Sequence, residues 1–152
     1  MQQKIDEIAA RLEREGKLGL SKQFIQHGNW SVYAHSRNVA AMALRIADKL
    51  HVRVDPEALI RGALLHDYFL YDWHRPNPDR RQHALFHASV ACDNAKRDYA
   101  LSDVEKDIIR RHMFPLVPIP PRTAEGWIVC LADKLCAAKE TFGAKAGDCD
   151  KR

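Results

Sequence analysis

Six histidine and aspartate side chains interrupt segments that are otherwise apolar and helical in pattern. They are His35, His66, Asp67, His87, His112 and Asp133. A carboxylate inside an apolar segment such as WIVCLADKLCAA is costly unless it is paired or bound to a metal ion. One histidine on an apolar face is usually a hydrogen-bonded core residue, but six such residues on separate segments are harder to explain in that way. Imidazole and carboxylate are the ligand set for Mn, Fe, Co, Ni or Zn, so the pattern indicates a transition-metal site.

Apolar residues recur at helical spacing through nearly the whole chain, and this pattern predicts the elements that must position these side chains. The first expected helix carries an apolar stripe around residues 5–12 and is interrupted by Gly16 and Gly19. Further helices are expected over residues 21–26, 31–50, 55–66, 82–99, 102–112 and 123–142. No segment is a convincing strand. We therefore predict an all-α, single-domain bundle of six to seven helices over residues 1–142, followed by a polar tail at 143–152.

Several helix boundaries carry local signals. Asp55 is expected to be an N-cap with Pro56 at the first helical position. Ser102 and Glu105 have the spacing of a capping box. The proline-containing segments HRPNPDRRQ and PLVPIPP are expected to be a loop and an extended connection.

Composition narrows the class of protein. The chain has 152 residues and a net charge of +4, with basic residues spread along it, which fits an anionic small-molecule ligand and makes nucleic acid an unlikely partner. None of the four cysteines forms a CxxC motif, and no segment has the length and apolarity of a signal peptide or membrane span. We expect a cytoplasmic protein without a membrane partner, and a homodimer is compatible with the sequence.

The ordered set His35, His66-Asp67 and Asp133 resembles the H…HD…D signature of the HD superfamily of metal-dependent phosphohydrolases. With His87 and His112 it resembles the longer H…HD…H…H…D pattern of the dinuclear members. The wider text QHG…SVYAHS…LLHDYFLYDWH…HAS…EKDIIRRHMFPL…LADK is also similar to a bacterial subfamily of small, stand-alone HD proteins. The resemblance covers residues 31–142 and implies the HD-type helical fold.

The same resemblance implies a divalent transition metal, with two ions, and a role for each residue. One ion would be held by His35, His66, Asp67 and Asp133. The second would be held by His87 and His112, with Asp67 as a bridge. Two such cations can activate a bridging water and clamp a phosphoryl oxygen, so His66 and Asp67 are expected to be catalytic and the substrate to be a small phosphorylated molecule.

Three residues near the expected ligands in the sequence have alternative roles. Lys134 is expected to be catalytic, either as a cation for substrate phosphate or as a partner of a ligand carboxylate, with a solvated helix lysine as the alternative. Glu140 lies seven residues beyond Asp133, where a surface role is expected. His83 shares a helix face with His87 and is a second candidate for that ligand position.

Substrate-binding residues are expected at two places. Beyond the His-Asp pair, Phe69 is expected to pack on the core, whereas Tyr71, Trp73 and His74 lie nearer the loop and could stack on an organic group. Arg75, Arg80 and Arg81 could steer phosphate groups there. Arg37 and His27 flank the first ligand segment and are candidate pocket residues.

Alternatives remain open on the sequence. The chain has no GYP segment and no adjacent histidine pair at His112, which argues against cleavage of cyclic dinucleotides. A di-iron oxygenase of the same fold uses a comparable ligand set. A metal-bearing module that binds a nucleotide without turnover is the non-enzymatic alternative.

Overall fold

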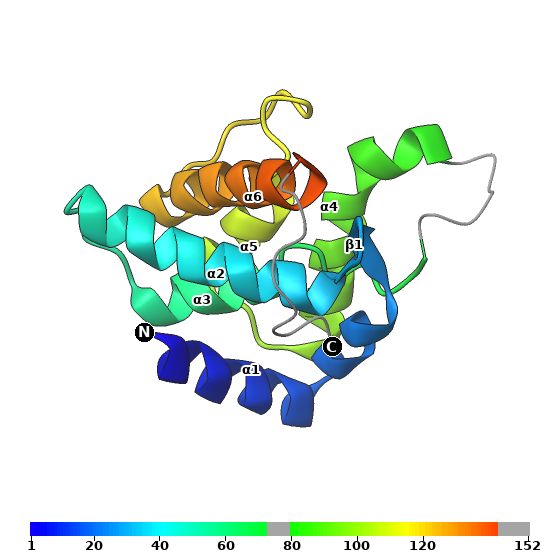
Figure 1. Cartoon of the computed structure of the whole chain (residues 1–152), viewed down its shortest axis with the longest axis horizontal. Helices are drawn as coiled ribbons and strands as arrows, with labels where there is room; N and C mark the ends of the chain where they lie inside the picture. The colour runs from blue at the N-terminus through cyan, green and yellow to red at the C-terminus, as the bar shows by residue number, and fades with distance from the viewer. Residues whose placement is uncertain (73–79, 143–152) are drawn as a thin grey trace.

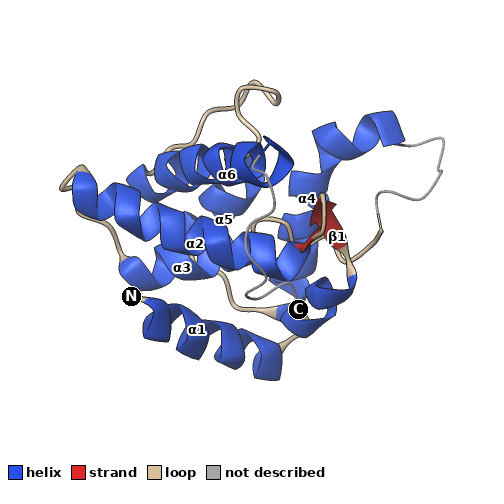
Figure 2. Ribbon diagram, in the orientation of Figure 1, coloured by secondary structure: helices blue, strands red, loops and turns tan. Residues whose placement is uncertain are grey.

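The computed structural model describes residues 1–72 and 80–142, with the side chains of helix α4 described from residue 86 onward. The helices are α1 (Gln2–Glu15), the short 3-10 helix η1 (Leu18–Gln23), α2 (Val32–Lys49), α3 (Pro56–Leu65), α4 (Arg80–Asp98), α5 (Asp103–Arg111) and α6 (Ala124–Phe142). Two short strands, β1 (Ile25–His27) and β2 (Trp30–Ser31), lie between η1 and α2 (Figures 1 and 2). The predicted all-α bundle of six to seven helices is confirmed.

The segment before α2 differs from the prediction. A helix was expected over residues 21–26, but η1 ends at Gln23 and the chain forms a small antiparallel hairpin with Ile25 paired to Ser31. Gly28 makes this possible because it adopts a φ of 57° in the turn, which is a conformation that glycine enters without strain. The expectation that no strand would form was therefore wrong.

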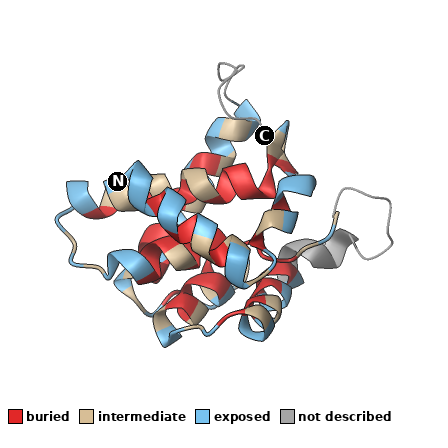
Figure 3. Ribbon diagram, turned by 90° about the horizontal axis from the view of Figure 1, so that it is seen from below, coloured by how far each residue is buried: buried red, intermediate tan, exposed pale blue. Residues whose placement is uncertain are grey.

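The interior of the bundle is built around α2 and α3. Helix α2 packs against α3 and α6, and α5 packs against α3, α4 and α6 (Figure 1). Helix α1 lies along one side and contributes its apolar stripe, as predicted, to the same core. Buried side chains consequently occupy the inward faces of the helices while the outward faces are exposed (Figure 3).

The predicted helix starts are confirmed. The Asp55 side chain accepts hydrogen bonds from Glu57 N (2.9 Å) and Ala58 N (3.2 Å), with Pro56 in the first turn. The capping box of Ser102 and Glu105 is formed in both directions. These caps fix where α3 and α5 begin.

Helices α3 and α5 approach closely at Gly62. A Cβ atom added there would lie 2.4 Å from Cδ1 of Ile108, so a larger residue fits only if the Ile108 side chain or one of the two helices shifts. The two helices end at His66 and His112, whose ring centroids are 4.8 Å apart. The close helix contact therefore brings two candidate ligands together.

Among the described residues, no helix has the length and apolarity needed to cross a membrane. Three of the four cysteines, Cys92, Cys130 and Cys136, are buried free thiols. Cys149 and the expected polar tail at 143–152 lie outside the described residues.

Candidate metal centre

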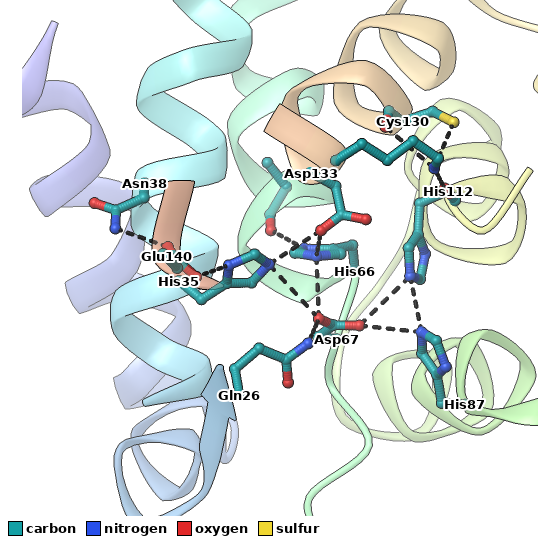
Figure 4. Close-up of polar contacts among 12 residues, drawn as sticks. Gln26, His35, Asn38, His66, Asp67, His87, His112, Cys130, Asp133 and Glu140 are labelled. Atoms are coloured by element: carbon teal, nitrogen blue, oxygen red, sulfur yellow. Dashed lines mark hydrogen bonds and ion pairs between the residues drawn. The ribbon is translucent and has the colours of Figure 1, made fainter. Parts of the chain in front are cut away.

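Five helical segments converge on the six predicted ligands. His35 comes from the first turns of α2, and His66 and Asp67 from the end of α3. His87, His112 and Asp133 come from α4, the end of α5 and the middle of α6 (Figure 4). All but Asp133 are buried, and the Asp133 side chain is only 13% exposed.

Four of these side chains form a first group. Its members are His35, His66, Asp67 and Asp133, whose ligand atoms all lie within 4.8 Å of one another. The Nε2 atom of His35 is 3.1 Å from Asp133 Oδ1, and the Nε2 atom of His66 is 3.2 Å from Asp67 Oδ2. Two imidazoles and two carboxylates thus face a common point.

Asp67 also belongs to a second group with His87 and His112. The Nε2 atoms of the two histidines are 3.0 Å apart, and each is 3.4 Å from Asp67 Oδ1. The Oδ2 atom of Asp67 faces the first group and its Oδ1 atom faces the second (Figure 4). This carboxylate can therefore bridge two cations.

Backbone carbonyls at the helix ends set the ring orientation of two histidines. Nδ1 of His66 lies 2.7 Å from the carbonyl oxygen of Ala63, and Nδ1 of His112 lies 2.8 Å from that of Ile109. A carbonyl oxygen only accepts, so each Nδ1 donates its proton. In the neutral ring, Nε2 then keeps a free lone pair that points into the centre, as a metal ligand requires.

His35 is oriented by a carboxylate instead. Nδ1 of His35 lies 2.7 Å from Glu140 Oε2, and Asn38 donates to the other carboxylate oxygen at 3.1 Å. The Glu140 side chain is only 4% exposed. The surface role expected for Glu140 was wrong, because two turns of α6 beyond Asp133 return its side chain to the same face against α2.

The charges of the side chains at the centre favour the binding of a cation. Burial alone would raise the pKa of Asp67 and of Asp133, but the neighbouring histidines outweigh it and lower both. Burial likewise opposes protonation of His35, yet hydrogen bonds with Asp133 and Glu140 raise its pKa to about 9. The cluster thus holds anionic carboxylates that attract positive charge even where burial is nearly complete.

Two buried atoms at this point are unsatisfied. His66 Nε2 and Asp67 Oδ1 make no hydrogen bond within the described part of the chain. An unpaired buried polar atom costs about 1–3 kcal/mol, and here one such atom faces each group of ligands. The donor set, the convergence and these two atoms all fit divalent metal ions in both groups.

A comparison with models of protein families identifies the family of this chain. The family model described as HD domain matches residues 32–138, which is most of the chain. The chain belongs to the HD domain family. Such domains bind divalent metals and are generally metal-dependent phosphohydrolases. Searches of curated proteins and of solved structures found no match.

The centre of the HD domain opens into a cavity of about 610 Å³. Its lining includes Asp67, His87, His112 and Asp133 at one end. The hairpin contributes Gln26 and His27, and His27 is thus part of the pocket wall as expected. The remaining wall comes from α6 and the connection between α5 and α6.

Lys134 lines this cavity but its ammonium group is already engaged. Nζ lies 2.8 Å from the carbonyl oxygen of His112, and 3.3 Å from both the carbonyl oxygen and Sγ of Cys130. The expected pairing with a ligand carboxylate is therefore wrong. Lys134 instead ties α6 to the end of α5 that carries His112.

Arg37 is directed away from the HD centre. Its guanidinium pairs with Asp6 of α1 and lies over the Tyr33 ring, 5.7 Å from the centroid. The expectation that it binds substrate was wrong, because its position two residues after His35 places it on the α1-facing side of α2.

The aromatic segment after α3 is only partly described. Phe69 is buried, as expected, and packs on Tyr71 with ring centroids 5.1 Å apart. Tyr71 is 37% exposed and is not among the residues that line the cavity. Trp73, His74 and Arg75 lie outside the described residues, as do the side chains of Arg80, Arg81 and His83.

Gln26 is a site residue that the sequence did not reveal. Gln26 lies on β1, and its Nε2 donates a hydrogen bond of 2.6 Å to Asp67 Oδ2 (Figure 4). The hairpin carries it there, and the only local signal for that hairpin was Gly28 in the segment QHGNW. A polar residue that fixes the carboxylate shared by the two groups could be recognised only once both segments were folded together.

Proposed function

We propose that this HD domain is a metal-dependent phosphohydrolase that acts on a small phosphorylated metabolite, a nucleotide or a phosphate ester, at a dinuclear centre. The observation that carries the proposal is the shared carboxylate of Asp67. Its two oxygens face two different groups of ligand atoms, at 3.2 Å from His66 Nε2 and at 3.4 Å from His87 Nε2. A bridging carboxylate between two histidine-rich groups is the arrangement that a pair of divalent ions needs.

The chemistry would be divided between the ions and the chain. Two bound divalent cations would supply positive charge that activates a water molecule and stabilises the charge on a phosphoryl group. His66 and His112 hold their Nε2 atoms toward the centre through backbone carbonyls. Gln26 holds the bridging carboxylate of Asp67 from the side of the first group.

The reaction requires no protein nucleophile. Water forms a new bond to phosphorus, the ester P–O bond breaks, and the alcohol leaves with one of the protons of water. The cavity beside the ligands, about 610 Å³, is in the size range of small-molecule sites, which supports a substrate of that size.

The test is metal-dependent hydrolysis. Protein stripped with a chelator and reloaded with Mn, Fe(II), Co, Ni or Zn would be assayed for phosphate release from phosphomonoesters and nucleotides. We expect activity with at least one metal, and a loss of roughly a hundredfold or more in Asp67→Asn, because this residue serves both ions. The metal content of the variant would be measured in parallel.

Asp103→Asn is the matched control. Asp103 is a fully exposed aspartate on α5, with a side-chain exposure of 100%, so the substitution changes net charge equally without touching the centre. Full activity in Asp67→Asn would reject the proposal. Oxygen consumption by iron-loaded protein, without phosphate release from any ester, would indicate an oxygenase instead.

A further inference from the structure

The lining of the cavity beside the metal centre combines residues of opposite chemical character. The ligand side chains of Asp67, His87, His112 and Asp133 form its ligand end. Four further lining residues, Met113, Pro115, Leu116 and Ala137, are apolar and are called the apolar wall. The first three belong to the connection between α5 and α6, and Ala137 lies one turn beyond Asp133 on α6.

The apolar wall is accessible. Leu116 is 56% exposed although it lines a cavity next to the candidate catalytic centre. A ligand that covers such a side chain removes apolar surface from water, which favours binding in proportion to the area covered. The wall is therefore suited to an apolar group of the ligand.

The described part of the cavity offers no uncommitted cation for further phosphate groups. Lys134 is the only lysine or arginine among its described lining residues. Its three ammonium protons have three protein acceptors, from His112 and Cys130. Among the described lining residues, a second phosphate placed against the apolar wall would lose hydration without a cation to compensate for it.

We propose that the cavity takes a phosphomonoester with a compact, largely apolar organic group, whose single phosphate lies at the ligand end and whose organic group lies on the apolar wall. This inference rests on the proposed function and narrows its substrate to one class. We expect a monophosphate to be preferred over the corresponding diphosphate and triphosphate.

The first test is a homologous series. The full chain loaded with Mn²⁺ would be assayed with linear alkyl phosphates from methyl to pentyl. Each methylene that reaches the apolar wall should raise kcat/KM about fourfold. Pentyl diphosphate should be roughly tenfold or more poorer than pentyl phosphate because only one of its two phosphates can lie at the ligand end.

A binding readout separates recognition from turnover. Methylphosphonate and pentylphosphonate would be titrated into the same protein by calorimetry, without oxygen. Leu116→Ser should weaken pentylphosphonate binding roughly tenfold and leave methylphosphonate unchanged. Ile119→Ser is the control, since Ile119 is 51% exposed on the same connection but is not among the residues that line the cavity.

The outcomes distinguish this inference from the proposed function. Ester hydrolysis that ignores chain length, or that prefers the diphosphate, would overturn the ligand class and leave the hydrolase intact. Equal effects of the two serine substitutions would also overturn it. If no ester is hydrolysed with any metal while phosphonate binding still follows chain length, the ligand class stands and the hydrolase assignment fails.

Discussion

Replacing Glu140 by glutamine tests whether this carboxylate supports the first group of metal ligands. Glu140 Oε2 is 2.7 Å from His35 Nδ1, and its other oxygen accepts from Asn38 at 3.1 Å. His35 Nδ1 needs an acceptor when His35 is a metal ligand through Nε2, and Asn38 donates to the same carboxylate. A carboxylate satisfies the two at once, whereas the amide of glutamine has one oxygen and one donor group. In the variant, either His35 faces an N–H, or the Asn38 amide must turn so that its oxygen accepts from glutamine.

The expected loss of metal affinity follows from that change of hydrogen bonding and from the lost negative charge. Removal of the hydrogen-bond partner of a metal-ligating histidine typically lowers metal affinity roughly 10–100-fold. A factor of this size corresponds to about 1.4–2.8 kcal/mol. The burial of the Glu140 side chain, at 4% exposure, argues for the upper part of this range because water cannot easily replace the lost acceptor.

The assay is competition between the protein and a chelator of known affinity, with metal stoichiometry measured separately. We expect Glu140→Gln to weaken the ion bound by the group that contains His35 and to leave the ion of the His87 and His112 group nearly unchanged. The matched control is Glu125→Gln on the same helix, where the side chain accepts only from Asp55 N at 2.9 Å. Unchanged affinity in Glu140→Gln, or equal weakening of both ions, would refute the reasoning.

Three further predictions follow from the described contacts. Gly62→Ala should lower the free energy of unfolding, measured in denaturant, by about 1–2 kcal/mol. The new Cβ meets Ile108 at 2.4 Å, and the higher helix propensity of alanine offsets only part of this clash. Wild-type stability would contradict this contact. Burial and the hydrogen bond to Glu13 raise the pKa of Tyr33 to about 12, so its contribution to stability should be complete below pH 10 and lost as pH rises through 12. Ultraviolet titration of tyrosinate in the wild type and in Tyr33→Phe measures the pKa of Tyr33. A difference between the two titrations centred near pH 10 would contradict the prediction. His112→Gln should reduce bound metal from two ions to one by elemental analysis, since the first group does not contain His112; retention of both ions would count against the assignment.

The sequence alone was sufficient to predict the features that depend on interactions between residues close together in the chain. The starts of α3 and α5 were predictable because Asp55, Ser102 and Glu105 act on backbone groups within three residues. The helices themselves followed from apolar periodicity. The ligand types were also visible, since a histidine or aspartate inside an apolar helix needs a partner wherever it lies.

The hairpin shows where local reasoning ended. Residues 21–26 are compatible with a helix, and only the left-handed turn at Gly28 together with packing of β1 near α6 selects the extended form. That choice carries Gln26 to Asp67, forty-one residues away along the chain. No periodicity within either segment encodes this contact.

Three polar residues near the ligands were decided in the same way. Glu140, Lys134 and Arg37 each lie close in sequence to a predicted ligand, which made several roles equally compatible. Contacts with α2, with the end of α5 and with α1 then gave them three different functions: to orient His35, to tie two helices together and to pair with Asp6. The sequence alone determined the fold class, the starts of α3 and α5 and the chemical types of the ligands, because these depend on short-range interactions. The place of Asp67 between two groups of ligands was expected only through the resemblance to a family. The tertiary structure decided which neighbours support the ligands, because those contacts join helices far apart in the chain.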